Sequence, residues 1–362
     1  MQVQPKTEKT DSSNRARHLK PLFQSENASF YQADFPNAPQ GFETYVVSTP
    51  ESAKMLSDPF VIGQDYRNAL GSAVTAALSR PQIQKHLEKL SDSQINVLHF
   101  LRGGLSYQVL EALAKTGRPF AKGSFMSSER KAVPSKTEPN CTEWKIHKDQ
   151  YIELNLEPNT ALFIGDITAS GSTIKSGLAK ILERFGDSKA ASVKQIVFFT
   201  TGGFITEEIM LDFHEKFKKT FPNYERTQLV FTEGIFHVAD SQNPVHNKTP
   251  GTDLVAWNAV LAPEFEELLR QNPLIGLEAC MIYDGGSRSF DFSKHFDCAL
   301  KYAHEVRESL EKGINAFDLI SDRWSGASLL SENARKKLSE PKTGLDWVKT
   351  REEKIRQLTK ND

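Results

Sequence analysis

Apolar and polar positions along the middle of the chain follow a regular order, in which short apolar runs lead into longer helical patterns. Residues 95–101 form a compact apolar run that predicts a buried strand, and a helical pattern follows it up to Gly117. A second run, residues 161–164, leads through a loop of small residues into a helical pattern that ends at Gly186. The pattern therefore predicts the order strand, loop, helix twice.

The same alternation continues further along the chain. Residues 193–199 and 228–232 predict two more strands, with a helical pattern between them. Strands that alternate with helices favour right-handed crossovers and a mainly parallel sheet. The sequence thus predicts an α/β fold in which helices flank a mainly parallel sheet.

Additions flank this core on both sides. We expect residues 1–27, which are polar and rich in charge and serine, to form a disordered or loose arm. Residues 28–94 contain a short predicted strand at 44–48, and helical patterns that we expect to pack on the core. Residues 95–235 form the core itself. In residues 236–362 a turn-rich stretch precedes helices that we expect to complete the core or to contact a second copy of the chain in a homodimer.

The composition argues against several classes of protein. The 362 residues include 45 basic and 46 acidic side chains, so the formal net charge of −1 gives no global attraction for nucleic acid or for an anionic membrane. No apolar run approaches the roughly 20 residues that span a bilayer. The three cysteines, Cys141, Cys280 and Cys298, lack metal-type spacing. They favour a reducing compartment, and we expect a cytoplasmic protein.

The loop after the strand at 161–164 is suited to binding a phosphate group. Small residues let an anion approach the first N–H groups of the following helix, which have no partner inside the helix, although such a turn can also simply cap a helix. The loop consists of Thr168, Ala169, Ser170, Gly171, Ser172 and Thr173. Asp166 stands at the carboxyl end of the strand, where a carboxylate can accept hydrogen bonds from sugar hydroxyls. A P-loop fits less well because no lysine follows Gly171.

The stretch Ile164–Thr173 resembles the signature of the type I phosphoribosyltransferases, and the resemblance covers residues 95–235. That signature has four apolar residues, two acidic residues and one apolar residue before a loop that holds the 5-phosphate of phosphoribosyl pyrophosphate (PRPP). Gly165 stands where the first acidic residue is expected. The departure leaves two interpretations open, which are lost catalysis and an altered substrate.

The resemblance implies a second anion-binding loop. Arg102, Gly103 and Gly104 resemble the family's pyrophosphate loop, where a guanidinium and exposed N–H groups hold diphosphate oxygens. The other interpretation is a surface arginine beside a structural glycine turn. The resemblance also allows a cis peptide bond between Leu101 and Arg102.

Two further segments are assigned by the same resemblance. Residues 123–157 form a long polar segment that resembles the mobile loop that closes over the active site, and it contains Arg130 and Lys131. Relatives often recognise the acceptor just after the last core strand. That position points to Phe236, His237 and Asp253 as acceptor-binding residues.

The resemblance implies a glycosyltransferase that transfers the phosphoribosyl group of PRPP to a nitrogen acceptor and releases pyrophosphate. Asp166, Arg102, Arg130 and Lys131 would be its catalytic residues, and Asp166 would help to place Mg²⁺, directly or through water or the ribose. Purine-salvage relatives of the hypoxanthine-guanine type carry an aspartate where Ala169 stands. We therefore expect a different base, an amine or a specialised metabolite as the acceptor.

Two other functions stay open. A protein with this fold can sense PRPP or a nucleotide without turnover, and Gly165 favours that hypothesis. The sequence contains no recognisable DNA-binding motif, which counts against a transcriptional regulator. The chain can also be an interaction protein whose C-terminal helices matter most.

Overall fold

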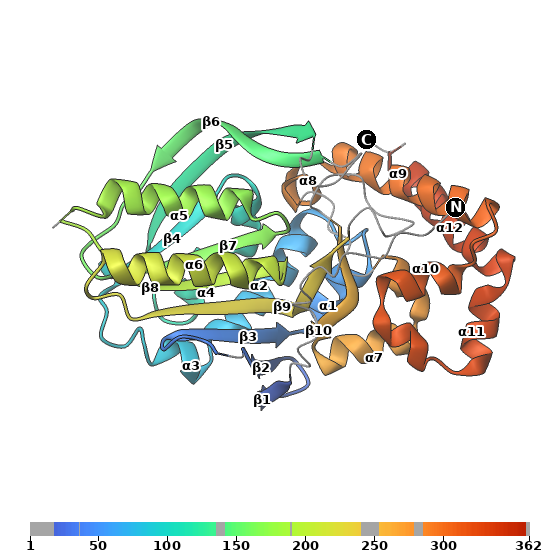
Figure 1. Cartoon of the computed structure of the whole chain (residues 1–362), viewed down its shortest axis with the longest axis horizontal. Helices are drawn as coiled ribbons and strands as arrows, with labels where there is room; N and C mark the ends of the chain where they lie inside the picture. The colour runs from blue at the N-terminus through green and yellow to red at the C-terminus, as the bar shows by residue number, and fades with distance from the viewer. Residues whose placement is uncertain are drawn as a thin grey trace, which may run out of the picture.

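The computed structural model describes residues 18–35, 37–134, 142–188, 190–239, 253–278 and 285–359. Within them a ten-stranded sheet has the order β1-β2-β3-β9-β8-β7-β4-β5-β6, and β10 pairs with β9 (Figure 1). The strands are β1 (Leu19–Gln24), β2 (Ser29–Ala33), β3 (Phe42–Ser48), β4 (Ile95–Phe100), β5 (Lys122–Pro134), β6 (Thr142–Glu153), β7 (Thr160–Thr168), β8 (Val193–Gly203), β9 (Arg226–Val238) and β10 (Leu254–Leu261).

The centre of the sheet is parallel and its margins are antiparallel. The pairs β3–β9, β9–β8, β8–β7, β7–β4 and β4–β5 are parallel, whereas β1–β2, β2–β3, β5–β6 and β9–β10 are antiparallel. All six residues of β4 are buried, as expected for a parallel strand that is covered on both faces. The predicted mixed α/β fold with a large, mostly parallel sheet is therefore confirmed.

Helices cover both faces of this sheet. Figure 1 shows α5 and α6 on the face toward the viewer and α2 and α4 on the opposite face. The helices of the amino-terminal part and core are α1 (Pro50–Ser57), α2 (Gly63–Leu78), α3 (Pro81–Gln84), α4 (Val109–Lys115), α5 (Ser172–Phe185) and α6 (Ile205–Thr220), with 3₁₀ turns η1 (Asp92–Gln94) and η2 (Gly103–Tyr107). The helices that follow β10 in the chain are α7 (Pro263–Gln271), α8 (Gly285–Phe290), α9 (Phe292–Glu311), α10 (Ala316–Arg323), α11 (Glu332–Ser339) and α12 (Pro341–Thr359), with 3₁₀ turns η3 (Pro273–Leu277) and η4 (Ser325–Leu329).

The C-terminal helices form a separate layer beside the carboxyl ends of the parallel strands (Figure 1). In α9 the residues Phe296, Ala303 and Val306 are buried on one face, as the helical spacing of apolar positions predicts. Val348 and Ile355 of α12 are buried as well. This layer completes the core, which is one of the two roles expected for it.

Two segments differ in structure from what their sequence suggests. Residues 19–24, assigned to the loose arm, form the edge strand β1, because Leu19 and Leu22 turn inward against β2 while the remaining positions face solvent. Residues 1–17 lie outside the described part. The polar segment 123–157, which resembles a mobile loop in the sequence, forms for the most part the hairpin β5–β6, with strands of 13 and 12 residues. Its polarity reflects a hairpin that extends beyond the rest of the sheet, where both faces meet water.

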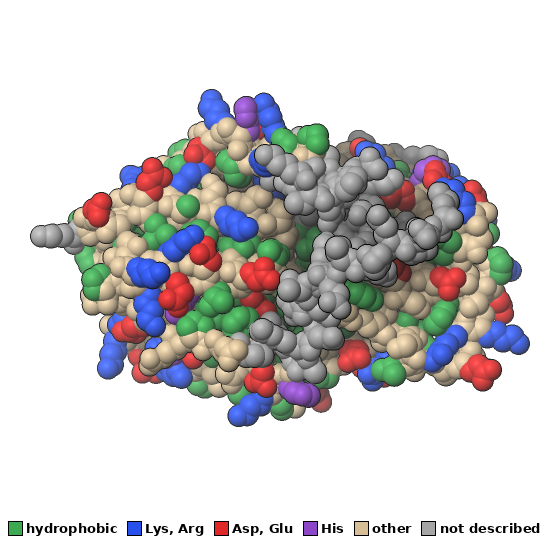
Figure 2. All heavy atoms as spheres, viewed as in Figure 1, with side chains coloured by type: hydrophobic (Ala, Val, Ile, Leu, Met, Phe, Trp, Pro, Cys, Tyr) green, Lys and Arg blue, Asp and Glu red, His purple; other side chains and the backbone are tan. Residues whose placement is uncertain are grey.

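The surface shows no dominant sign of charge. On the face in Figure 2, Lys and Arg side chains are interspersed with Asp and Glu over the described residues, and hydrophobic side chains form small separate groups. This distribution agrees with the near-neutral composition.

Candidate active site at the carboxyl ends of β4 and β7

The two predicted anion-binding loops lie side by side. Because β4 pairs with β7 in parallel, from Ile95 opposite Ala161 to Leu98 opposite Ile164, the loops that follow these strands emerge at one edge of the sheet. A Cβ built on Gly103 would lie 3.6 Å from Oδ1 of Asp166. The structure thus brings together the pyrophosphate-type loop and the carboxylate at the end of β7.

The small-residue loop passes directly from β7 into α5. Gly171, the N-cap residue of α5, has a φ of +70°, and a Cβ at this position would lie 2.1 Å from Cδ1 of Ile209. The positive φ and the close approach of Ile209 both favour glycine at this position. Ser170 is exposed, and its Oγ lies 3.1 Å from Oγ of Ser172. Gly171 itself offers no side-chain acceptor, and the backbone N–H of Ser172 makes a long hydrogen bond of 3.5 Å to Oγ of Ser170, so the start of α5 can bind an anion.

The two glycines in the loop after β4 have different roles. Gly103 adjoins Asp166, whereas a Cβ on Gly104 would lie 3.0 Å from the carbonyl oxygen of Gly165. Gly104 thus allows the loop to approach β7 closely. Arg102 is exposed at the start of this turn, and the peptide bond between Leu101 and Arg102 is cis, as the family resemblance allowed.

The structure gives a physical reason for the glycine that replaces the first expected acid. A Cβ on Gly165 would lie 2.5 Å from Cβ and 2.7 Å from Cγ of Tyr107, and 3.1 Å from Cγ2 of Val109. Contacts this short exclude any side chain at position 165 unless Tyr107 moves. The space that a side chain at position 165 would use is therefore filled by a tyrosine from η2.

Tyr107, which follows β4, also reaches β8 on the far side of β7. Its hydroxyl accepts a hydrogen bond from the backbone N–H of Thr201 at 2.8 Å and lies 3.4 Å from Oγ1 of the same residue. Burial raises the pKa of this hydroxyl well above its ordinary value, so it stays neutral. Sequence reasoning missed Tyr107, because nothing in its local pattern distinguishes it from any other core residue.

The hairpin β5–β6 carries Arg130 and Lys131 past the end of β4. Adjacent residues of a strand point to opposite faces, so only one of these side chains can face the two loops in this conformation. Nζ of Lys131 lies 2.8 Å from Nε2 of His147, and an ion pair between Lys180 and Asp149 ties the hairpin to α5. That Arg130 and Lys131 join the site when this segment closes over it stays a prediction.

The C-terminal region contributes an unexpected wall. Oγ of Ser289 in α8 lies 2.6 Å from Oγ of Ser106, and a Cβ on Gly285 would lie 2.4 Å from Cδ1 of Ile167. A Cβ on Gly103 would lie 3.9 Å from the backbone nitrogen of Gly286. The two glycines that begin α8 gave no signal in the sequence that they would reach the loops, because the contact joins segments some 180 residues apart.

Two of the three predicted acceptor residues are structural. Phe236 is fully buried, with its ring centroid 6.3 Å from that of Phe265. Asp253 is also buried and accepts hydrogen bonds from Arg323 at 2.6 and 2.9 Å. The structure contradicts an acceptor-binding role for both side chains. His237 is half-buried, and its ring packs edge-on against Trp257 with a centroid distance of 5.5 Å.

Comparisons with known proteins leave the family open. No family model matches the chain, and no curated protein matches its sequence. Among solved structures, the chain is similar to the adenine phosphoribosyl transferase of Trypanosoma brucei in complex with AMP, pyrophosphate and ribose-5-phosphate. That similarity covers 52% of this chain and 83% of the other, with 12% sequence identity and a TM-score of 0.31.

The donor groups at the site fit only a lightly held metal ion. Among the described residues, no group of three or more His, Cys, Asp or Glu side chains could hold a metal. Asp166 offers one carboxylate beside the two loops. A Mg²⁺ ion chelated by a diphosphate keeps several waters and needs few protein ligands, so a single carboxylate is compatible with it.

The helices also bear on the expected relation to membranes. Within the described residues, none of them combines the length and the apolar character that a bilayer crossing requires.

Proposed function

We propose that this protein transfers the phosphoribosyl group of PRPP to a nitrogen acceptor and releases pyrophosphate. The observation that carries the proposal is the juxtaposition of two glycine-containing loops with Asp166 between them, at the edge where open α/β sheets bind ligands. One loop suits a single phosphate at a helix N-terminus, and the other combines N–H groups with Arg102. PRPP carries a phosphate at one end and a diphosphate at the other, with a ribose between them.

Each part of the site then has a task. The N–H groups at the start of α5, with the hydroxyls of Ser170, Ser172 and Thr173, hold the 5-phosphate. Asp166 accepts hydrogen bonds from the ribose hydroxyls, and its negative charge stabilises the positive charge that develops on the ribose ring. Holding both ends of PRPP fixes the anomeric carbon relative to the acceptor.

The leaving group requires positive charge. The bond between the anomeric carbon and the diphosphate oxygen breaks, and its electron pair leaves with pyrophosphate, while the acceptor nitrogen supplies the pair for the new bond. Arg102 stabilises the growing charge on the diphosphate through paired hydrogen bonds. Mg²⁺ bound to the diphosphate would neutralise part of the same charge. One of Arg130 and Lys131 adds to it if the hairpin bends toward the loops.

Pyrophosphate release tests this proposal directly. The full chain is incubated with PRPP and Mg²⁺ and with one member at a time of a panel of bases and amines. We expect release with at least one acceptor. Arg102→Ala should lower turnover far more than it lowers the affinity for ribose 5-phosphate, because the diphosphate charge grows only in the transition state. Equal turnover in the variant would remove Arg102 from the mechanism.

A PRPP sensor is the second candidate. The observation in its favour is Tyr107, which fills the space beside Gly165 and leaves no room there for a second acidic side chain. A sensor would bind PRPP, as measured by calorimetry, and would release no pyrophosphate with any acceptor. The same panel therefore separates the two functions.

A further inference from the structure

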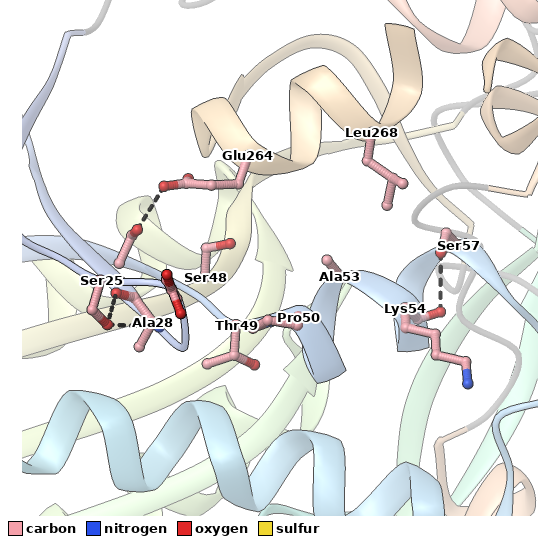
Figure 3. Close-up of a pocket in the computed structure, with 12 residues that line it drawn as sticks. Ser25, Ala28, Ser48, Thr49, Pro50, Ala53, Lys54, Ser57, Glu264 and Leu268 are labelled. Carbon is pink, nitrogen blue, oxygen red and sulfur yellow. Dashed lines mark hydrogen bonds between the residues drawn. The ribbon is translucent and has the colours of Figure 1, made fainter. Parts of the chain in front are cut away.

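A cavity of about 370 Å³ lies between α1, α7 and the turn that joins β1 to β2 (Figure 3). This volume is within the range of pockets that bind small molecules. The cavity adjoins the end of β3, which is separated from β7 by β9 and β8. At about 4.8 Å per strand, it lies roughly 14 Å from the phosphate loop along the sheet. It is therefore distinct from the proposed active site.

The walls of the cavity combine an apolar surface with one fixed carboxylate. Pro50 and Ala53 of α1 and Leu268 of α7 supply the apolar surface. Glu264 supplies the carboxylate, and Figure 3 shows it on the same helix as Leu268, across the cavity from α1. Such a combination suits a ligand with a hydrocarbon body and one polar end.

Glu264 is held in place by two hydroxyls. Oγ of Ser29 donates to Oε1 at 2.5 Å, and the Tyr31 hydroxyl donates to the same oxygen at 2.6 Å. The side chain of Gln24 and the backbone N–H of Glu264 also interact with this carboxylate. Partial burial by itself would raise the pKa of Glu264, but these hydrogen bonds outweigh it and hold the pKa below its ordinary value. The carboxylate is thus ionised and oriented before any ligand arrives.

The surrounding charges favour a cation. Glu26 is a second carboxylate on the wall, and Lys54 is the one basic residue that lines the cavity in the described part of the chain. Figure 3 shows the Lys54 side chain extending away from Glu264. Behind the wall, the buried Glu233 accepts a hydrogen bond from Oγ of Ser48 at 2.7 Å, but burial raises its pKa to about 7, so its carboxyl is only partly ionised at neutral pH and the negative charge comes mainly from Glu264 and Glu26. An anionic ligand would meet repulsion at this end, whereas an ammonium group would gain a charge-assisted hydrogen bond.

We propose that this cavity binds a small primary amine in its ammonium form. The ammonium group donates to Glu264, and an aliphatic body of about five carbons packs against Ala53, Pro50 and Leu268. Because the cavity is distinct from the two loops, the proposal does not depend on phosphoribosyl transfer, and each can fail without the other.

Three probes of similar shape test the polar end. They are 3-methylbutylamine, 3-methylbutanol and 4-methylpentanoate, which share the 3-methylbutyl group and differ in the head group. Binding is followed by calorimetry and by ligand-observed NMR at pH 7.5. We expect the amine to bind, the alcohol to bind at least tenfold more weakly and the carboxylate not to bind. No binding of the amine, or equal binding of the carboxylate, would overturn the proposal.

Variants test the location. Glu264→Gln removes the charge and should weaken amine binding at least tenfold, and Ala53→Leu should abolish it by filling the cavity. Glu267→Gln changes a carboxylate on the same helix that does not line the cavity and should leave the affinity unchanged. Circular dichroism and thermal unfolding establish that each variant is folded. Wild-type affinity in either Glu264→Gln or Ala53→Leu would show that the amine binds elsewhere.

Discussion

The loops at β4 and β7 and the cavity between α1 and α7 lie at the same edge of the sheet, but they are built in opposite ways. The loops present glycines, hydroxyls, helix N–H groups and an arginine, and they suit anions. The cavity presents an oriented carboxylate between apolar helix faces and suits a cation. In the two proposals one sheet edge carries two sites of opposite charge preference, because different segments build them: the loops after β4 and β7 in one case, and α1, α7 and the β1–β2 turn in the other.

The largest effect on turnover is expected at Asp166. Asp166→Asn keeps the shape of the side chain and removes the charge that faces the ribose in the proposed mechanism, so turnover should fall roughly 10²- to 10³-fold. The free energy of unfolding should change by less than about 1 kcal/mol, because the position is only half-buried. Asp187→Asn, at an exposed position after α5, serves as the control. Unchanged turnover in Asp166→Asn would mean that the loops do not act together on a sugar.

Gly165 tests whether the tyrosine over β7 is essential to the fold. Gly165→Asp forces a charged side chain into the space that Tyr107 fills, and we expect a loss of at least about 4 kcal/mol of stability in urea unfolding. Gly165→Ala adds only the Cβ and should cost about 1–3 kcal/mol. In the background of Tyr107→Gly, which lacks both Tyr107 atoms that the new Cβ would meet, Gly165→Ala should cost less than it does in the wild type. Full additivity of the two changes would contradict the observed contact.

The cavity region should respond to pH through Glu233. Burial raises the pKa of this carboxyl from its ordinary 4.5 to about 7. Because the folded-state pKa is the higher one, the stability it contributes is fully present below pH 4.5 and is lost as the pH rises through 7. The loss is about 3 kcal/mol. In urea unfolding, the free energy of unfolding should therefore fall by about 3 kcal/mol less in Glu233→Gln than in the wild type between pH 4.5 and 8.

Two details of that measurement matter. Burial also raises the pKa of Glu278 to about 7, and this contribution remains in both proteins, so only the difference between them reports on Glu233. Parallel stability curves for the wild type and the variant would place the titration elsewhere.

Gly171 should show the smallest of these effects. Gly171→Ala places a Cβ on a residue with positive φ and against Ile209, and we expect a loss of about 1–2 kcal/mol. Ile209→Val removes the atom that the new Cβ would meet, so in this background only the backbone part of the cost, about 1 kcal/mol, should remain. A neutral Gly171→Ala would show that the loop can adopt a different path into α5.

The loops could be predicted from the sequence and the cavity could not. Strand, loop and helix are adjacent in the chain, so the positions of Asp166 and Gly171 followed from a single stretch of ten residues. The cavity joins segments whose members are more than 230 residues apart, as in the hydrogen bond from Ser29 to Glu264. A local sequence pattern cannot predict a contact between residues so far apart in the chain.

The failed acceptor residues have the same cause. Asp253 was chosen because it follows the last core strand, but its role is set by Arg323, which lies 70 residues later. A buried carboxylate needs a partner, and the sequence does not show which of its many basic residues supplies one. The role of Tyr107 could not be predicted either, because it depends on the absence of a side chain at Gly165, which lies on β7.

Arg288 contacts the end of α1, a segment that is synthesised long before it. Its guanidinium is buried and donates to the carbonyl oxygens of Met55, Asp58 and Val61 at 2.8, 2.5 and 2.8 Å. Ribosomes add roughly 5–20 residues per second, so the 230 residues between Asp58 and Arg288 take about 10–50 s to emerge. During that interval the end of α1 lacks its native partner. We expect nascent chains halted before residue 288 to be cut by protease near residues 55–61, and chains released at full length to resist it.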